Sequence, residues 1–129
     1  MYQGECAGSL ICGLGLTVAH FNTGNGAAVH MYDCNGASSP RWTWNGSELR
    51  SDLNGRCLDV SFGNGDNGTL VDMYDCIRSD HQWWSWIGGE LQTAFNGKCL
   101  SIANSNWWNG AAVLTWDCAG ATNQHWHLA

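Results

Sequence analysis

The stretch VDMYDCIRSDHQWW (71–84) decides the fold, because the chain contains it in three versions. VHMYDCNGASSPRW (29–42) lies 42 residues before it, and VLTWDCAGATNQHW (113–126) lies 42 residues after it. The similarity needs no gaps and divides the chain into units 4–45, 46–87 and 88–129. A period of this length indicates supersecondary units that are stacked or related by symmetry.

Each unit reads as short strands separated by tight turns. In CLDV (57–60) and LVDMY (70–74) apolar and polar residues alternate, and Asn-Gly pairs follow at regular positions, as in β-hairpins. The alternation predicts that Leu58, Val60, Val71 and Met73 point inward, and that Cys57, Asp59, Asp72 and Tyr74 point outward. Ten columns are identical in all three units, including Gly13/Gly55/Gly97, Leu16/Leu58/Leu100, Val29/Val71/Val113, Asp33/Asp75/Asp117 and Trp42/Trp84/Trp126.

The repeats predict a closed all-β fold. Four short strands in each unit give about a dozen strands in a sandwich or barrel. An open solenoid would need polar caps at its ends, but the first and last units are as apolar as the middle one. We therefore expect a β-trefoil with pseudo-threefold symmetry, formed by residues 1–129 as a single domain.

The composition of the chain indicates which partners it can bind and in which compartment it acts. Eleven acidic and five basic residues give a formal charge of −6, which disfavours nucleic acid and anionic membranes. No apolar run approaches the roughly 20 residues of a membrane helix. Seven cysteines and 17 glycines are typical of a disulfide-stapled extracellular domain. No signal peptide is visible, so we expect a secreted protein in its mature form; sequons at Asn45 and Asn67 agree with secretion.

Three motifs carry a resemblance to a known family. They are Gly-x-Cys-Leu-Asp-Val (55–60), then Asn-Gly-x-x-Val-x-x-Tyr/Trp-Asp-Cys (67–76 and 109–118), then Gln-x-Trp (82–84 and 124–126). The chain resembles the ricin-B-type (R-type) lectins and the Q-x-W carbohydrate-binding modules attached to xylanases and other glycosidases. Unit one departs from the pattern, with Gly15, Thr17 and Pro40 in place of the cysteine, the aspartate and the glutamine.

The resemblance implies one disulfide in each of the second and third units, Cys57–Cys76 and Cys99–Cys118. Each would clip two neighbouring strand ends and stabilise the fold by roughly 3 kcal/mol. A zinc site would need closely spaced cysteine pairs, and none occurs. In unit one, Cys12 or Cys6 would pair with Cys34, which leaves one thiol free or available to cross-link two chains.

Carried over residue by residue, the family's sugar site falls on Asp59, Tyr74, His81 and Gln82 of unit two, with Asp72 at a further contact position. An aromatic ring stacks on the C–H face of a pyranose while carboxylates accept hydrogen bonds from hydroxyls. We expect galactose or N-acetylgalactosamine recognition, strongest in unit two. The histidine stands where asparagine is usual.

The other two units depart further from the family's site. Unit three keeps Trp116, Asn123 and Gln124 but has Ser101 and Leu114 in place of the acids, so its site should be weaker by ~1.5–3 kcal/mol. Unit one should bind no sugar.

Several residues also have structural interpretations. The invariant tryptophans, Trp42, Trp84 and Trp126, are expected in the core, and Asp33, Asp75 and Asp117 are expected to bond turn amides. Gln82 and Gln124 could be partly structural. Trp107-Trp108 lie outside the repeat pattern and suit an interface, an extended sugar subsite or a small satellite cluster.

We expect no enzyme and no cofactor. A glycosidase needs one carboxyl group with a raised pKa, and the sequence around Asp59 and Asp72 offers no apolar surroundings to raise it. A calcium ion between Asp59 and Asp80 is an alternative that their oxygen ligands allow.

Glycans or glycoproteins are the expected partners. Because single shallow sugar sites bind at about millimolar strength, a homo-oligomer or an attached domain would raise the affinity. A protein-interaction or inhibitor module is the alternative function, as is the sugar-targeting domain of a larger glycosidase or toxin.

Overall fold

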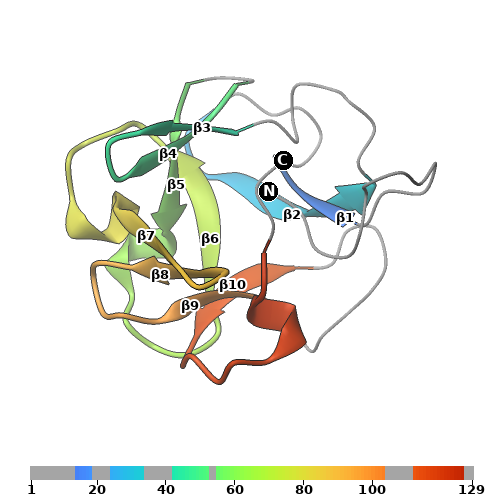
Figure 1. Cartoon of the computed structure of the whole chain (residues 1–129). Helices are drawn as coiled ribbons and strands as arrows, with labels where there is room; N and C mark the ends of the chain where they lie inside the picture. The colour runs from blue at the N-terminus through green and yellow to red at the C-terminus, as the bar shows by residue number, and fades with distance from the viewer. Residues whose placement is uncertain (1–13, 19–23, 34–41, 53–54, 104–111, 127–129) are drawn as a thin grey trace.

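The computed structural model describes residues 14–18, 24–33, 42–52, 55–103 and 112–126 (Figure 1). These residues form ten strands: β1 (Leu14–Val18), β2 (Ala27–Asp33), β3 (Trp42–Asn45), β4 (Glu48–Ser51), β5 (Cys57–Val60), β6 (Thr69–Tyr74), β7 (Trp84–Ile87), β8 (Glu90–Thr93), β9 (Cys99–Ile102) and β10 (Val113–Trp116). Three short 3-10 helices follow strands: η2 (Ser61–Gly63), η3 (Asp80–Gln82) and η5 (Thr122–Gln124). In the part of the chain that the structure describes, no helix is long and apolar enough to cross a membrane.

The strands repeat with the period of the sequence. β4 to β7 make up one complete unit of four strands, and β8, β9 and β10 occupy the positions of β4, β5 and β6 one period later. β1, β2 and β3 likewise precede β5, β6 and β7 by one period. The predicted four-stranded unit is therefore confirmed for the second repeat; the fourth strand of each other repeat falls outside the described residues.

Three equivalent pairings join the repeats into a ring. The antiparallel sheet runs β3-β4-β5-β6-β10-β9-β8-β7, and β2, which pairs with β1, also pairs with β6. Ala28 lies opposite Asp72, Leu70 opposite Leu114 and Ala112 opposite His30, and each pair is one period from the next. Because the third pairing returns to the first repeat, the sheet closes around a pseudo-threefold axis instead of extending as a solenoid (Figure 1).

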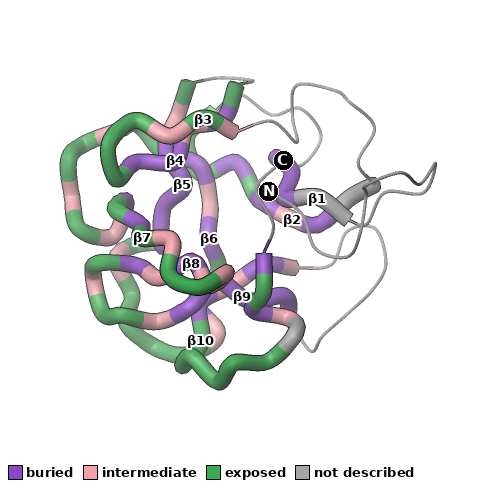
Figure 2. The backbone as a smooth tube through the Cα atoms, in the orientation of Figure 1, coloured by how far each residue is buried: buried purple, intermediate pink, exposed green. Residues whose placement is uncertain are grey.

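The core lies at the centre of this ring, where Figure 2 shows the inner faces of the strands as buried. Leu16, Leu58 and Leu100 are fully buried at equivalent positions. The indole N–H groups of Trp42, Trp84 and Trp126 donate to the carbonyls of these three leucines at 2.7, 3.0 and 3.0 Å. Trp84 and Trp126 are buried and Trp42 packs against the core, so the prediction of core tryptophans is confirmed. Each such burial stabilises the fold by roughly 1.5–3 kcal/mol.

Both predicted disulfides are present. Cys57 is bonded to Cys76 and Cys99 to Cys118, with Cα atoms 5.3 and 5.1 Å apart. Each bond ties the first residue of one strand to the second residue beyond the end of the neighbouring strand, β5 to β6 and β9 to β10. Cys6, Cys12 and Cys34 lie outside the described residues, and so do Trp107 and Trp108.

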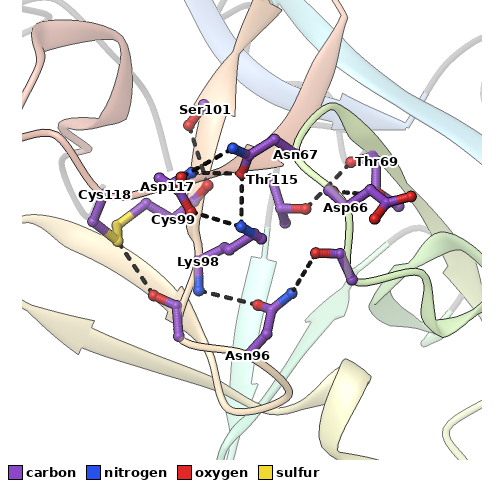
Figure 3. A network of polar contacts seen from close by, with 12 residues as sticks. Asp66, Asn67, Thr69, Asn96, Lys98, Cys99, Ser101, Thr115, Asp117 and Cys118 are labelled. Carbon is purple, nitrogen blue, oxygen red and sulfur yellow. Dashed lines mark hydrogen bonds and ion pairs between the residues drawn. A yellow bond between two sulfur atoms is a disulfide. The ribbon is translucent and has the colours of Figure 1, made fainter.

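Polar clamps join successive repeats on the outside (Figure 3). Asn67 donates from Nδ2 to Asp117 Oδ2 at 3.0 Å and accepts at Oδ1 from the Asp117 amide at 2.9 Å. Lys98 Nζ donates to both side chains, and this contact, followed by the Asn67 bond, lowers the pKa of the Asp117 carboxyl. Asn25, Asp75 and Arg56 form the equivalent clamp. Asp75 and Asp117 are therefore structural, as predicted, but their carboxylates accept from an asparagine of the preceding repeat and from a basic side chain of their own repeat instead of from turn amides.

Candidate functional site

Two carboxyl groups face each other on the outer side of the second repeat. Asp59 on β5 is the direct cross-strand partner of Asp72 on β6. Tyr74, two residues along the same face of β6, is 41% exposed, so its predicted outward orientation is confirmed. The predicted exposure of Asp59 and Cys57 is wrong: Asp59 is only 4% exposed and Cys57 is fully buried. Alternation sets the face on which a side chain lies, but remote segments decide whether that face is covered.

His81 covers Asp59. The histidine lies in η3, which packs against β5, and its Nδ1 is hydrogen-bonded to Asp59 Oδ1. The edge of the His81 ring meets Phe95 with centroids 6.4 Å apart, and its Cδ2 lies 3.4 Å from where a Cβ on Gly63 would be. Gly63 therefore lies in van der Waals reach of the imidazole. The histidine is held against the acid from two sides.

Burial changes the acid chemistry of the pair. Removal from water, followed by the charge of Asp59, raises the pKa of Asp72 from 3.8 to about 6. Burial also raises the pKa of Asp59, against the opposing effect of the His81 contact. The expectation that nothing nearby would raise a carboxyl pKa is therefore wrong. Asp72 Oδ1 is buried and has no hydrogen-bond partner among the described residues, and an unsatisfied buried acceptor of this kind calls for a partner from outside them.

Phe62 is a residue that the sequence analysis missed. It lies in η2, is fully exposed and has a left-handed backbone, with φ 56°. Its neighbours belong to the site, because Ser61 lies close enough to Asp72 to lower the pKa of that carboxyl and Gly63 lies beside His81. Exposed aromatic side chains in a strained conformation are often functional. The signal was present in the sequence, since the equivalent positions hold the polar residues His20 and Asn104.

The glutamine of the Q-x-W motif holds the loop beneath the site. Gln82 is fully buried; its Nε2 donates to the Asp75 carbonyl at 2.8 Å and its Oε1 accepts from the Ile77 amide at 2.9 Å. Gln124 makes the same two bonds with Asp117 and Ala119. Direct sugar contact by Gln82 is therefore not what the structure shows, because both ends of its amide are used by the backbone. The glutamines fix η3 and η5 against the strands.

The third repeat presents an open depression of about 330 Å³ at the equivalent place. Among its lining residues are the predicted Trp116, Asn123 and Gln124, together with Ser101 and Leu114 at the positions of the two acids. Trp116 is 48% exposed. Asn123 donates from Nδ2 to the Ile102 carbonyl at 3.0 Å, whereas His81 at the same position bonds an acid. The structure thus brings the predicted residues of repeat three together, around a neutral floor.

The described residues offer little to a metal ion. Two groups of three ligand-type side chains lie within 4.8 Å of one another, Glu48 with Cys57 and Cys76, and Glu90 with Cys99 and Cys118. In both groups the cysteines are joined in a disulfide, so they supply no thiolate ligand. Neither group contains Asp59 or Asp80, the pair considered for calcium.

The sequence matches the family model of the ricin-type beta-trefoil lectin domain over residues 9–127. The chain belongs to this family. The R-type resemblance is confirmed, and carbohydrate binding is the function class of the domain. No curated protein sequence matches the chain.

Solved structures agree with the fold. The designed 3-fold symmetric protein ThreeFoil is similar with a TM-score of 0.81 and 27% identity, over 88% of each chain, which confirms the β-trefoil. The C-half of an earthworm R-type lectin, solved in complex with GalNAc, has a TM-score of 0.73 and 19% identity over 85% of each chain. The exo-beta-1,3-galactanase 1,3Gal43A from Clostridium thermocellum has a TM-score of 0.78 and 23% identity, over 95% of this chain and 30% of that one.

Proposed function

We propose that the second repeat binds galactose or N-acetylgalactosamine through Asp59, Asp72 and Tyr74, with His81 moving off Asp59 when the sugar binds. The observation that carries the proposal is the buried Asp72 oxygen, which lacks a partner and lies opposite Asp59 on the face that also carries the exposed Tyr74 ring. Vicinal hydroxyls donate to the two carboxylates, and the C–H face of the sugar stacks on the tyrosine. Since His81 covers Asp59, a hydroxyl reaches this acid by replacing the imidazole nitrogen.

A second, weaker site in the third repeat fits the same proposal. Trp116 supplies the exposed ring and Asn123 an amide at the edge of the depression. Without a carboxylate on its floor, this site lacks a charge-assisted hydrogen bond, which corresponds to roughly 1.5–3 kcal/mol of binding free energy. In repeat one, Thr17 is buried at the position of Asp59, and we expect no sugar there.

We propose binding without catalysis. Asp59 and Asp72 are cross-strand partners whose charges act on each other. Glycosidases hold their two carboxyl groups roughly 5–9.5 Å apart, with the scissile bond between them. Asp59 is only 4% exposed and is covered by His81, so a scissile bond does not fit between these two groups.

The disulfides bear on where the protein acts, and the weakness of single sugar sites bears on how it binds its partners. Disulfides persist in oxidising compartments, so we propose a secreted protein. Its partners would be glycans or glycoproteins. Two sites on one chain, a homo-oligomer, or attachment to a larger glycosidase or toxin would supply the avidity that one shallow site lacks.

The test is retention on immobilised galactose, with elution by free galactose. The wild type should be retained, Asp59→Asn should elute early, and Asp66→Asn, which removes a charge from an exposed turn, should behave as the wild type. Retention of Asp59→Asn equal to the wild type would contradict the assignment of this site. Capture of a protein partner that free sugar does not displace would favour the interaction module instead.

A further inference from the structure

A separate depression of about 380 Å³ lies at the junction of the first and second repeats. One wall is the turn between β3 and β4, and the other comes from the residues on either side of η3. The walls are joined by a β-bridge between Glu48 and Trp83 and by a hydrogen bond from the Trp84 amide to the Ser47 carbonyl at 2.8 Å. None of the residues assigned to sugar binding lines it. The lining residues are Asn45, Ser47, Glu48, Arg78 and Trp83.

Arg78 brings an uncompensated positive charge to this depression. The other described lysines and arginines each have a carboxylate partner: Arg50 pairs with Glu48, Arg56 with Asp75 and Lys98 with Asp117. Arg78 forms no ion pair or hydrogen bond with any described residue. In a chain with a formal charge of −6, a cation left without a partner at the edge of a depression is available to an anion.

The backbone at Arg78 would suit glycine better. Its φ is 57°, in the left-handed region that side chains with a Cβ disfavour. The equivalent residues of the other repeats are Gly36 and Gly120, and Gly120 has a φ of 66°. The second repeat therefore keeps an arginine where the turn itself calls for glycine, which is expected when the side chain has a function.

The neighbouring aromatic residue also differs between repeats. In the third repeat the His125 ring packs against the turn, 2.6 Å from where a Cβ on Gly89 would be. In the second repeat Ser47 occupies the turn position and Trp83 takes the place of the histidine. Trp83 remains 38% exposed and lines the depression. The turn that a histidine covers in one repeat is thus bordered by an accessible indole in the other.

We infer that this depression binds a carboxylate-bearing sugar, such as a hexuronic acid residue of a glycan. The guanidinium of Arg78 matches the planar carboxylate, and the Trp83 indole stacks on the C–H face of the pyranose. Asn45 and Ser47 supply polar groups for the hydroxyls. Glu48 does not repel the anion strongly, since its Oε1 accepts hydrogen bonds from Arg50 at 2.9 Å and Asn45 at 3.3 Å. The site is separate from the proposed galactose site and does not depend on it.

The experiment compares methyl β-glucuronide with methyl β-glucoside, which differ only in the C6 carboxylate. Each is titrated into ¹⁵N-labelled protein made without N-glycans, because Asn45 belongs to a sequon. The Trp83 indole N–H signal, assigned with Trp83→Phe, should shift saturably with glucuronide at about millimolar strength. Glucoside should bind at least about tenfold more weakly. Equal shifts from both compounds would overturn the inference.

Arg78→Gly is the most informative variant, because it introduces the residue found in the other two repeats and removes the backbone strain at position 78. It should weaken glucuronide binding at least about tenfold, and Arg78→Gln should do the same without changing the backbone. Lys98→Gln, which removes a cation elsewhere, should bind as the wild type. Undiminished binding by Arg78→Gly or Arg78→Gln would refute the site.

Galactose titrations in parallel separate the two proposals. Asp59→Asn should lose galactose and keep glucuronide, and Arg78→Gly should do the opposite. Failure of galactose alone would refute the proposed function of repeat two and leave this inference standing. Failure of glucuronide alone would refute this inference and leave the proposed function standing.

Discussion

The second and third repeats have the same backbone framework, but the site residues on it are charged in the second repeat and neutral in the third. Strands β5 and β6 pair in the same register as β9 and β10, one repeat later in the chain. A disulfide joins each pair at equivalent positions. In repeat two the frame holds Asp59 and Asp72, with His81 covering one acid. In repeat three Ser101 and Leu114 take these positions, and the equivalent Asn123 bonds a backbone carbonyl beside an open depression.

The difference teaches which residues make the frame and which make the surface. The buried glutamines, the indole-to-carbonyl bonds and the outer clamps are the same in both repeats. The groups that form these bonds find their partners within the chain, so the bonds do not depend on which residues form the sugar site. The residues on the outer face of these strands, Asp59 and Asp72 in one repeat and Ser101 and Leu114 in the other, can then change from charged to neutral without loss of the fold.

The largest effect should come from removing the acid beneath the histidine. Asp59→Asn keeps the shape of the side chain but removes a charged acceptor, so galactose affinity at repeat two should fall by about 10- to 100-fold, or ~1.5–3 kcal/mol. Isothermal titration calorimetry measures the change. Ser101→Ala, at the equivalent position in repeat three, is the matched control and should leave this site unchanged. If both variants lose the same affinity for galactose, the charged site of repeat two is not the one that binds it.

The next effect concerns the dependence of stability on pH. Because the pKa of Asp72 is raised from 3.8 to about 6 in the folded protein, the folded state holds more protons than the unfolded state between about pH 4 and 6. Its contribution to the free energy of unfolding therefore decreases as the pH rises through this window.

Asp72→Asn tests this sign. It should raise the free energy of unfolding at pH 7 by about 1 kcal/mol, a value reduced for the partial exposure of the carboxyl group, and should have little effect at pH 4. Urea denaturation at both pH values provides the measurement. Leu114, already apolar in repeat three, offers no such titration, so Leu114→Asn should show no pH-dependent gain. An equal effect of Asp72→Asn at both pH values would be inconsistent with a raised pKa.

A smaller effect is expected from exchanging the covering residue. His81→Asn introduces the residue of repeat three, whose amide turns toward a backbone carbonyl and would uncover Asp59. Galactose affinity at repeat two should rise by about threefold, or ~0.7 kcal/mol. The reverse change, Asn123→His, has no acid to cover and should not alter galactose binding. A loss of affinity in His81→Asn would show that the imidazole contacts the sugar directly.

The smallest effect should come from the clamps that the two repeats share. Lys98→Met removes a surface cation from the Asn67–Asp117 pair, and surface ion pairs contribute about 0–1 kcal/mol. The free energy of unfolding should fall only slightly at low salt and by less in high salt. Arg56→Met, in the equivalent clamp, is the control and should match it. Unequal losses would mean that the clamps are not equivalent.

The residues of the site were only partly predictable. Tyr74 was expected to face outward, and it does, because period-2 alternation is a property of the strand itself. The burial of Asp59 and the exposure of Phe62 were not predicted, and Gln82, expected to contact sugar and to be partly structural, bonds the backbone with both ends of its amide. Each depends on how η2 and η3 fold back over β5 and β6, and no local pattern encodes that contact.

The sequence by itself determined the three repeats, their strands and the closed trefoil, since these follow from periodicity, and its resemblance to the R-type lectins implied the two disulfide pairs. Only the tertiary structure decided that a histidine covers the acid of repeat two, that repeat three keeps an open depression, and that Arg78 and Trp83 border another. These features arise where segments distant in the chain meet, and the burial of a group there depends on every side chain packed around it.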